Sequence, residues 1–279
     1  MLSPTQFLQQ QFSLQNKVAL ITGGTGVLGR EMARALAGAG ANVIILGRRK
    51  ALAEELIKKL GNEFGQQGLA IEADVTNQGS LEKALKEIET KFGAVDILVN
   101  AAGGNMPGAI IQPGQSFFDL DIFDYQKVFD LNLTGSLLPT LIFCRGWVKS
   151  KKGVIINISS VTAQRAITRV MGYSLAKAAI DNFTKWLSVE LATKYGDGIR
   201  VNAIAPGFFI TEQNKKLLTN EDGSLTERGQ KVITQTPMKR FGYAEELSGA
   251  LIWLCSDASK FVTGTVVNVD GGFGAYSGI

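Results

Sequence analysis

The stretch Thr22-Gly23-Gly24-Thr25-Gly26-Val27-Leu28-Gly29 decides the fold, because it joins an apolar run to a segment with helical periodicity. The apolar run is 18–21, and the helical segment is 30–37. Glycines between a strand and a helix let the backbone approach a pyrophosphate, and the first turn of the helix adds unpaired N–H groups. Residues 23–29, the glycine turn, therefore predict a dinucleotide site, with Gly23, Gly24, Thr25, Gly26, Val27, Leu28 and Gly29 as its members.

Short apolar runs alternate with amphipathic segments along the rest of the chain. The runs predict strands at 43–46, 69–71, 97–99, 154–158, 200–204 and 266–269, and the segments predict helices at 52–60, 81–92, 125–147, 173–194 and 249–255. Strands that are apolar throughout are typical of a parallel sheet covered on both faces. We therefore expect an α/β fold with a doubly wound parallel sheet of the Rossmann type. We expect it to form a single domain, 15–279, after an N-terminal extension, 1–14.

The composition excludes several kinds of chemistry. The chain has 279 residues and no histidine, so no Ser-His-Asp triad, histidine metal site or imidazole acid/base is possible. Its two cysteines, Cys144 and Cys255, suggest no disulfide scaffold and favour a cytoplasmic location. A net charge of +4, without a dense basic tract, gives no reason to expect nucleic acid. No apolar stretch is long enough for a membrane span, and we expect no metal.

The end of the second predicted strand bears on the choice of cofactor. An NAD enzyme is expected to carry an acid there for the ribose 2′-hydroxyl. This chain has Gly47 followed by Arg48 and Arg49, and a guanidinium suits a 2′-phosphate. We therefore favour NADP over NAD, although the two arginines could simply begin a helix and face water. Asp74 and Val75, after the third strand, could hold the adenine, or Asp74 could cap the next helix.

A second constellation lies in the middle of the chain. Tyr173 and Lys177 are spaced to share one helix face, where an ammonium favours the phenolate. Ser160 follows the predicted strand 154–158, and Asn132 lies within the predicted helix 125–147. Singly, these could be a core aromatic, a turn hydroxyl and a helix kink. Ser159 is an alternative to Ser160.

With these motifs the chain resembles the short-chain dehydrogenase/reductase family. Supporting signals are Asn100-Ala101-Ala102-Gly103, Pro206-Gly207 and Asp270-Gly271-Gly272. The resemblance implies hydride transfer with a nicotinamide and a catalytic tetrad. Tyr173 would be the general acid, Lys177 would lower its pKa and bind the ribose, Ser160 would bind the substrate oxygen, and Asn132 would anchor a water. It also implies cofactor contacts from Asn100, Ala101, Ala102, Gly103, Tyr173, Lys177, Pro206, Gly207, Phe209 and Thr211.

Finer features resemble the D-mannonate oxidoreductase, or fructuronate reductase, subgroup. They are Gly103–Pro107, Phe117–Leu120, the stretch 217–226 and the tail 273–278. This resemblance implies a sugar-acid substrate and NAD, so the choice between NAD and NADP stays open. A carboxylate and hydroxyls need a cation and polar partners. The candidates are Asn105, Ser160, Gln164, Arg165 and Arg169, although both arginines could equally lie on the surface.

Other readings stay open. The stretch 208–236 is expected to be an irregular substrate lid. The family implies a homotetramer or homodimer built from helices near 121–147 and 173–194 and the last strand. Alternative activities are those of gluconate 5-dehydrogenase and 3-oxoacyl-carrier-protein reductase. Outside enzymes, the chain could be a dinucleotide-sensing regulator, although a sensor has no need of Tyr173 and Lys177.

Overall fold

The strands form one parallel sheet in the order β3-β2-β1-β4-β5-β6-β7 in the computed structural model, which describes residues 2–211 and 214–278. Every strand is close to its predicted position, and the expected doubly wound Rossmann-type sheet is confirmed. The strands are β1 Val18–Thr22, β2 Asn42–Gly47, β3 Gly68–Glu72, β4 Ile97–Asn100, β5 Gly153–Ile158, β6 Ile199–Pro206 and β7 Val266–Val269.

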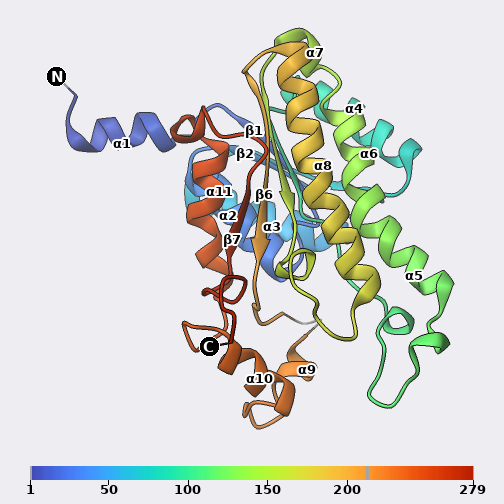
Figure 1. Cartoon of the computed structure of the whole chain (residues 1–279). Helices are drawn as coiled ribbons and strands as arrows, with labels where there is room; N and C mark the ends of the chain where they lie inside the picture. Colours follow the sequence, from blue (N-terminus) through green and yellow to red (C-terminus); the bar gives the residue numbers. More distant parts are fainter. Residues whose placement is uncertain (1, 212–213, 279) are drawn as a thin grey trace.

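Helices cover both faces of the sheet, as Figure 1 shows, and this explains why the strands are apolar throughout. One face packs against α2 Val27–Gly38, α3 Lys50–Phe64 and α11 Ser248–Cys255. The other packs against α4 Gln78–Phe92, α6 Gly135–Phe143 and α8 Met171–Tyr195. All residues of β1 and β6 are buried. The sheet is thus the rigid centre from which the loops at its edge project.

The predicted single helix 125–147 is wrong. The structure has α5 Ile122–Phe129, a π-helical turn Asp130–Thr134, α6, and then α7 Trp147–Ser150. The Asn132 side chain donates to the carbonyl oxygen of Val128 at 2.7 Å and so competes with the regular helical bonds. Pro139 within α6 lacks the N–H that a regular helix needs. A π turn of this kind often marks a functional position.

The N-terminal extension contains α1, Pro4–Phe12, which projects from the body of the molecule (Figure 1). Ser3 and Gln6 form a capping box, and Pro4 occupies the first turn. None of the residues of α1 is buried. Leu14, by contrast, is buried in the core of the domain. The domain boundary after residue 14 stays a prediction.

We expected the stretch 208–236 to be irregular, and this is wrong for part of it. It contains α9 Lys215–Leu218 and α10 Glu227–Gln235, and α10 begins at an N-cap, Thr226, whose side chain accepts from the Gly229 N–H. Residues 212–213 of the predicted lid lie outside the described residues. We keep the name lid for 208–236. Figure 1 shows α9 and α10 side by side near the C-terminus.

Short 3₁₀ turns complete the chain at Pro107–Ala109, Phe117–Asp119, Val161–Ala163, Ala244–Leu247 and Asp257–Ser259. In the part of the chain that the structure describes, no helix is both long and apolar enough to cross a membrane. The strand order reverses between β1 and β4, and the carboxyl ends of the strands meet at one edge. Ligands of open α/β sheets bind at such a switch point.

Candidate active site

The glycine turn is packed so closely that two of its positions exclude a side chain. Gly23 has φ +68°, and a Cβ there would lie 2.8 Å from the Ala102 backbone. A Cβ on Gly29 would lie 2.3 Å from the Gly23 carbonyl oxygen. Helix α2 begins within the glycine turn, and its N-cap, Gly26, contributes no side-chain hydrogen bond. The first N–H groups of α2 therefore keep their capacity to bind an anion such as a pyrophosphate.

A cavity of about 1440 Å³ runs from this turn along the carboxyl ends of the strands to α8. It is large enough for a dinucleotide and a small substrate together. Most of the predicted cofactor residues line it: Gly23, Thr25, Gly26, Val27, Leu28, Gly29, Arg48, Arg49, Asp74, Val75, Ala101, Ala102, Gly103, Tyr173, Lys177, Pro206, Gly207, Phe209 and Thr211. The residues present thus fit a nicotinamide dinucleotide, by their donor groups and by the space that their backbones leave.

Two predicted cofactor residues lie outside the cavity wall. Gly24 faces the core, where a Cβ would meet Ile21 and Ile45 at 3.0 Å. The Asn100 side chain is buried, and its amide donates to Asn157 at 2.9 Å and to Thr140 at 3.1 Å. Both residues therefore support the site from behind, by packing and by a buried polar network.

The end of β2 presents two guanidinium groups to the cavity. Arg49 donates to the backbone oxygen and the hydroxyl of Thr25, each at 3.0 Å, and so braces the glycine turn. Arg48 is exposed, and its charge helps to lower the pKa of Asp74. The larger cause of that lowered pKa is hydrogen bonding from Thr76, whose backbone N–H and hydroxyl both donate to the carboxylate. Arg48 therefore presents an exposed guanidinium at the cavity wall, where it can reach a ligand.

Tyr173 and Lys177 lie one turn apart on α8, with the Lys177 Nζ 5.5 Å from the centre of the Tyr173 ring. The Lys177 ammonium donates to the Ile158 carbonyl oxygen at 2.7 Å. Burial lowers the pKa of Lys177 to about 8, against the smaller opposing effect of Asp181. Burial also raises the pKa of the Tyr173 phenol, and hydrogen bonding with the Ser160 side chain opposes that rise. A phenol that keeps its proton at neutral pH is suited to act as an acid.

The structure separates the two candidate serines. Ser160 lines the cavity, where its hydroxyl accepts from the Thr162 N–H at 3.2 Å. Ser159 also contributes to the cavity wall, but its hydroxyl donates to the Asp181 carboxylate, whereas the Ser160 side chain is hydrogen-bonded with the Tyr173 phenol. Ser160 is therefore the serine placed with Tyr173, as its position after β5 predicts.

Asn132 uses its side chain to hold the backbone beside Lys177. Its amide donates to the carbonyl oxygens of Gly104 and Val128 at 2.8 and 2.7 Å, and its oxygen accepts from the Gly104 N–H at 3.2 Å. A Cβ on Gly103 would lie 2.6 Å from that oxygen and 3.3 Å from the Lys177 Nζ. The π turn thus joins Asn132, the Gly103-Gly104 backbone and Lys177 into one unit.

The predicted substrate residues have different positions. Asn105 and Ser160 line the cavity, whereas Gln164, Arg165 and Arg169 are not part of its wall. Arg165 donates to the carbonyl oxygens of Gly274 and Tyr276, so it holds the C-terminal tail.

Gln164 donates to Asp181 at 3.4 Å and accepts from Asn268 at 3.2 Å. Arg169 is held by the 110–112 loop, donating to the Ile111 carbonyl oxygen and the Gln112 side chain at 3.0 Å each. Direct contact of Gln164, Arg165 and Arg169 with a substrate stays a prediction. The structure does not favour it for Arg165, whose side chain is bonded to the C-terminal tail.

Sequence reasoning missed Arg228. This residue lies in the first turn of α10 and lines the cavity together with Tyr173. It stands in a charged stretch that reads as a solvated helix face. The available signal was the N-cap Thr226 just before it, but nothing in the local sequence shows that α10 packs over the cavity.

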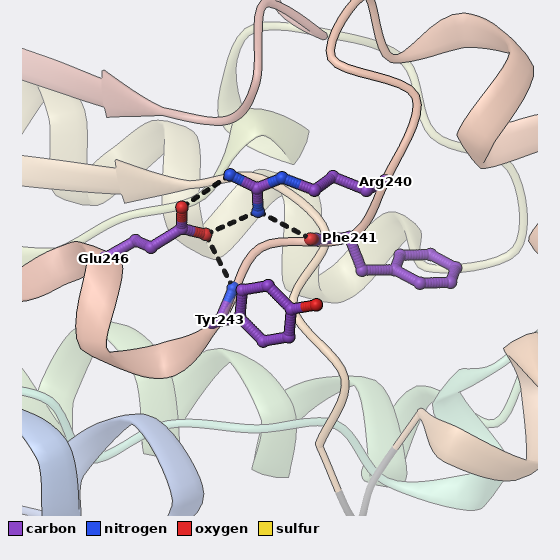
Figure 2. A network of polar contacts seen from close by, with 4 residues as sticks. All are labelled: Arg240, Phe241, Tyr243 and Glu246. Atoms are coloured by element: carbon purple, nitrogen blue, oxygen red, sulfur yellow. Dashed lines mark hydrogen bonds and ion pairs between the residues drawn. The ribbon is translucent and has the colours of Figure 1, made fainter.

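The start of the lid is bonded to the segment that follows the lid in the chain. Phe209 and Gly242 form a parallel β-bridge, and the Gly242 N–H donates to the Phe208 carbonyl oxygen at 2.9 Å. Figure 2 shows the network beside this bridge, where Arg240 makes a two-point ion pair with Glu246 and donates to the Phe241 carbonyl oxygen. The hydrogen bonds from Arg240 hold the pKa of Glu246 at about 2. The first residues of the lid are therefore fixed beside residues 240–246, which follow the lid.

Comparison with known proteins identifies the family. The chain matches the family model described as "Enoyl-(Acyl carrier protein) reductase" over residues 25–274. The chain belongs to the short-chain dehydrogenase/reductase family. It is 48% identical over 276 residues to the uncharacterized oxidoreductase UxuB of Bacillus subtilis (strain 168), covering 96% of this chain and 98% of the relative. The enzyme is therefore an NAD(P)-dependent dehydrogenase/reductase.

Two solved structures are similar over nearly their whole length. A proposed D-mannonate oxidoreductase from Haemophilus influenza, with bound NAD, is 42% identical with a TM-score of 0.90, over 98% of this chain and 100% of that one. A gluconate 5-dehydrogenase from Burkholderia cenocepacia J2315, in complex with NADP and tartrate, is 33% identical with a TM-score of 0.84, over 96% and 99% of the two chains. Both nicotinamide dinucleotides thus occur among similar proteins.

Proposed function

We propose that the enzyme reduces the keto group of a sugar acid, with D-fructuronate, which would give D-mannonate, as the first candidate. The observation that carries this proposal is the wall of the cavity that holds Tyr173, because it also includes Ser160, Asn105 and Arg228. Polar and charged groups at a binding site favour a polyhydroxylated anion, because an apolar ligand would leave them without partners. The 42% identity to a proposed D-mannonate oxidoreductase supports the same choice.

In the proposed mechanism Tyr173 donates its proton to the substrate carbonyl oxygen. A reduced nicotinamide held by the glycine turn and Lys177 would supply the hydride that the carbonyl carbon needs. Ser160 donates a hydrogen bond to the same oxygen and so positions it at the phenol. The Lys177 ammonium, close to the phenol, stabilises the phenolate that remains. Asn132 holds the Gly104 backbone beside Lys177. Its part in anchoring a water that returns a proton to Tyr173 stays a prediction.

We propose that NADP(H) is the preferred cofactor. Arg48 would pair with the 2′-phosphate, because it lines the cavity at the end of β2, where the chain has no acid. Arg49 would act indirectly, through the Thr25 contacts that brace the glycine turn. The D-mannonate oxidoreductase-like structure with bound NAD favours the opposite choice, so this part of the proposal is tested separately.

We also propose assembly into a homodimer or homotetramer in the cytoplasm. Exposed apolar side chains lie on the helices predicted to meet in such an assembly, among them Leu141 on α6 and Trp186 and Val189 on α8. Both cysteines are free, as expected in a reducing compartment. Light scattering after size-exclusion chromatography tests the assembly, and a monomer at micromolar concentration would contradict it.

The substrate proposal is tested by following NADPH and NADH oxidation with a panel of carbonyl compounds. We expect turnover with D-fructuronate and formation of D-mannonate. Faster turnover with 5-ketogluconate would favour the second candidate, gluconate 5-dehydrogenase activity, which the similar structure with NADP and tartrate supports. Turnover only with an acetoacetyl thioester would indicate a 3-oxoacyl-carrier-protein reductase. Cofactor binding without any turnover would favour a dinucleotide-sensing regulator.

A further inference from the structure

A guanidinium group from the lid, that of Arg228, lines the same cavity as Tyr173. Arg228, in the first turn of α10, is half-buried. Its two terminal nitrogens donate to the hydroxyl and the carbonyl oxygen of Thr168, each at a long 3.3 Å. These are weak bonds for a group with five donors, so most of its hydrogen-bonding capacity remains for a ligand.

A second guanidinium lies close to the first. Arg169 follows Thr168 in the chain and has φ +80°, the left-handed region that costs energy for a residue with a side chain. Two side-chain bonds to the 110–112 loop hold it, and its own carbonyl oxygen accepts from the Ile111 N–H at 3.0 Å. The strained backbone is therefore fastened in place, and the Arg169 charge is fixed beside the lid.

The two positive charges disfavour each other. The pKa of Arg228 is lowered, mainly by burial and secondly by the charge of Arg169. Among residues 2–211 and 214–278, neither arginine has a carboxylate within ion-pair distance. Arg240, at the base of the same lid, shows the contrast, because Glu246 neutralises it through two hydrogen bonds (Figure 2). Two partly buried cations without a carboxylate partner favour the binding of an anionic ligand, because the anion neutralises them.

We propose that Arg228, supported by Arg169, binds the carboxylate of the substrate and makes the lid the element that selects acidic over neutral sugars. This inference rests on the proposed function, since it assumes that the carbonyl of a sugar acid lies at Tyr173. Arg228 contributes from the lid and Arg169 from the body of the protein. Arg169 lies outside the cavity wall and acts through its charge, and a carboxylate bound to Arg228 would offset the repulsion between the two arginines. The pyrophosphate of the cofactor is the other source of an anion in this cavity, and the test distinguishes the two.

The test compares Arg228→Met with a matched control on the same helix, Lys231→Met. Lys231 is exposed and pairs with Glu227, outside the cavity wall, so its replacement removes one charge from α10 without changing the cavity. KM is measured for D-fructuronate and for its neutral amide. Loss of a charge-assisted pair predicts that Arg228→Met raises KM for the acid by about tenfold to a hundredfold. We expect KM for the amide to change less than about twofold, within the spread of minor surface effects.

Further variants make the result specific. Arg228→Lys keeps the charge and should recover part of the affinity for the acid, whereas Lys231→Met should behave as the wild type. An equal rise in KM for acid and amide would overturn the proposal, as would no rise at all. A rise in KM for NADPH alone would assign Arg228 to the cofactor pyrophosphate and would also overturn it. Unfolding curves and cofactor fluorescence show whether each variant is folded.

A failure of the proposed function is recognised separately. If the wild type oxidises no cofactor with D-fructuronate, the proposed substrate is wrong, and calorimetry with tartrate then tests the anion site alone. We expect the wild-type complex with NADP to bind tartrate and Arg228→Met to bind it at least about tenfold more weakly. Equal binding by the two proteins would overturn the carboxylate site.

Discussion

The two ends of the cavity are built in different ways. At the nucleotide end the backbone forms the wall, and its glycines approach neighbouring backbone atoms so closely that a Cβ on Gly29 would lie 2.3 Å from a carbonyl oxygen. At the substrate end side chains form much of the wall, and they come from the loop after β4, the loop after β5 and the lid. A backbone wall can serve every member of a family that shares a cofactor. A wall of side chains on loops can change with the substrate.

The largest effect is expected where the two ends meet. Replacing Tyr173→Phe removes the proposed proton donor and should lower kcat by about 10²–10⁴-fold. Cofactor affinity should stay close to that of the wild type, because the glycine turn and Arg48 are unchanged. Steady-state kinetics and cofactor fluorescence measure the two quantities. A variant that keeps more than a tenth of the wild-type kcat would remove Tyr173 from the mechanism.

Lys177 offers a test by pH. Its pKa is lowered by burial from 10.5 to about 8, so at neutral pH the folded protein holds a buried charge at a cost. Between pH 8 and 10.5 the folded state releases this proton while the unfolded chain keeps it, and the stability of the wild type therefore rises with pH. We expect the cofactor-free Lys177→Met variant to lack this rise, which amounts to about 3 kcal/mol.

Urea unfolding of both proteins between pH 7 and 10 measures this difference. The free energy of unfolding of the variant, relative to that of the wild type, should be greatest below pH 8 and should decrease above pH 8. A difference that is constant with pH would show that Lys177 titrates normally in the folded state.

Arg48 sharpens the comparison within the nucleotide end, because it is a side chain in a region built mostly of backbone. Arg48→Ala should raise KM for NADPH by about tenfold to a hundredfold and leave KM for NADH unchanged, since only NADPH carries the 2′-phosphate. Kinetics with both cofactors decide the point. Equal changes, or a wild type that prefers NADH, would reject the pairing.

The smallest effect concerns the packing of the glycine turn. Gly29→Ala should lower the free energy of unfolding by about 1–3 kcal/mol, because its Cβ would overlap the Gly23 carbonyl oxygen. The control is Gly249→Ala on α11, an exposed position where a Cβ meets nothing within 4 Å. There alanine should stabilise the protein by about 0.5–1 kcal/mol. Similar changes in both variants would contradict the close packing.

The difference between a backbone wall and a side-chain wall also explains which features could be predicted from the sequence. The strands and the glycine turn were predictable, since continuous apolar runs and closely spaced glycines are local patterns. The π turn at Asn132 was not, because it depends on side-chain bonds to the Val128 and Gly104 carbonyls. Arg228 was missed because only the packing of α10 brings it to the cavity. Helix α1 could have been found from its capping box and Pro4, but its glutamine-rich sequence hid the pattern.

The predicted roles of Arg165 and Arg169 show the same limit. Their position between Ser160 and Tyr173 predicts that they border the pocket, but it does not predict the direction of each side chain, and neither arginine is part of the cavity wall. Arg165 turns to the C-terminal tail, and Arg169 to the 110–112 loop. Neighbours in sequence on a loop can therefore face different parts of the molecule, which a pattern of residue types does not reveal.

The central claim is that this cavity brings the carbonyl of a sugar acid to Tyr173 and the nicotinamide. The most direct measurement is a single-turnover experiment, in which the enzyme with bound NADPH is mixed with D-fructuronate and cofactor absorbance is followed. We predict rapid oxidation of one cofactor per active site, with D-mannonate as the product. Absence of oxidation with D-fructuronate, together with rapid oxidation by an acetoacetyl thioester, would contradict the claim.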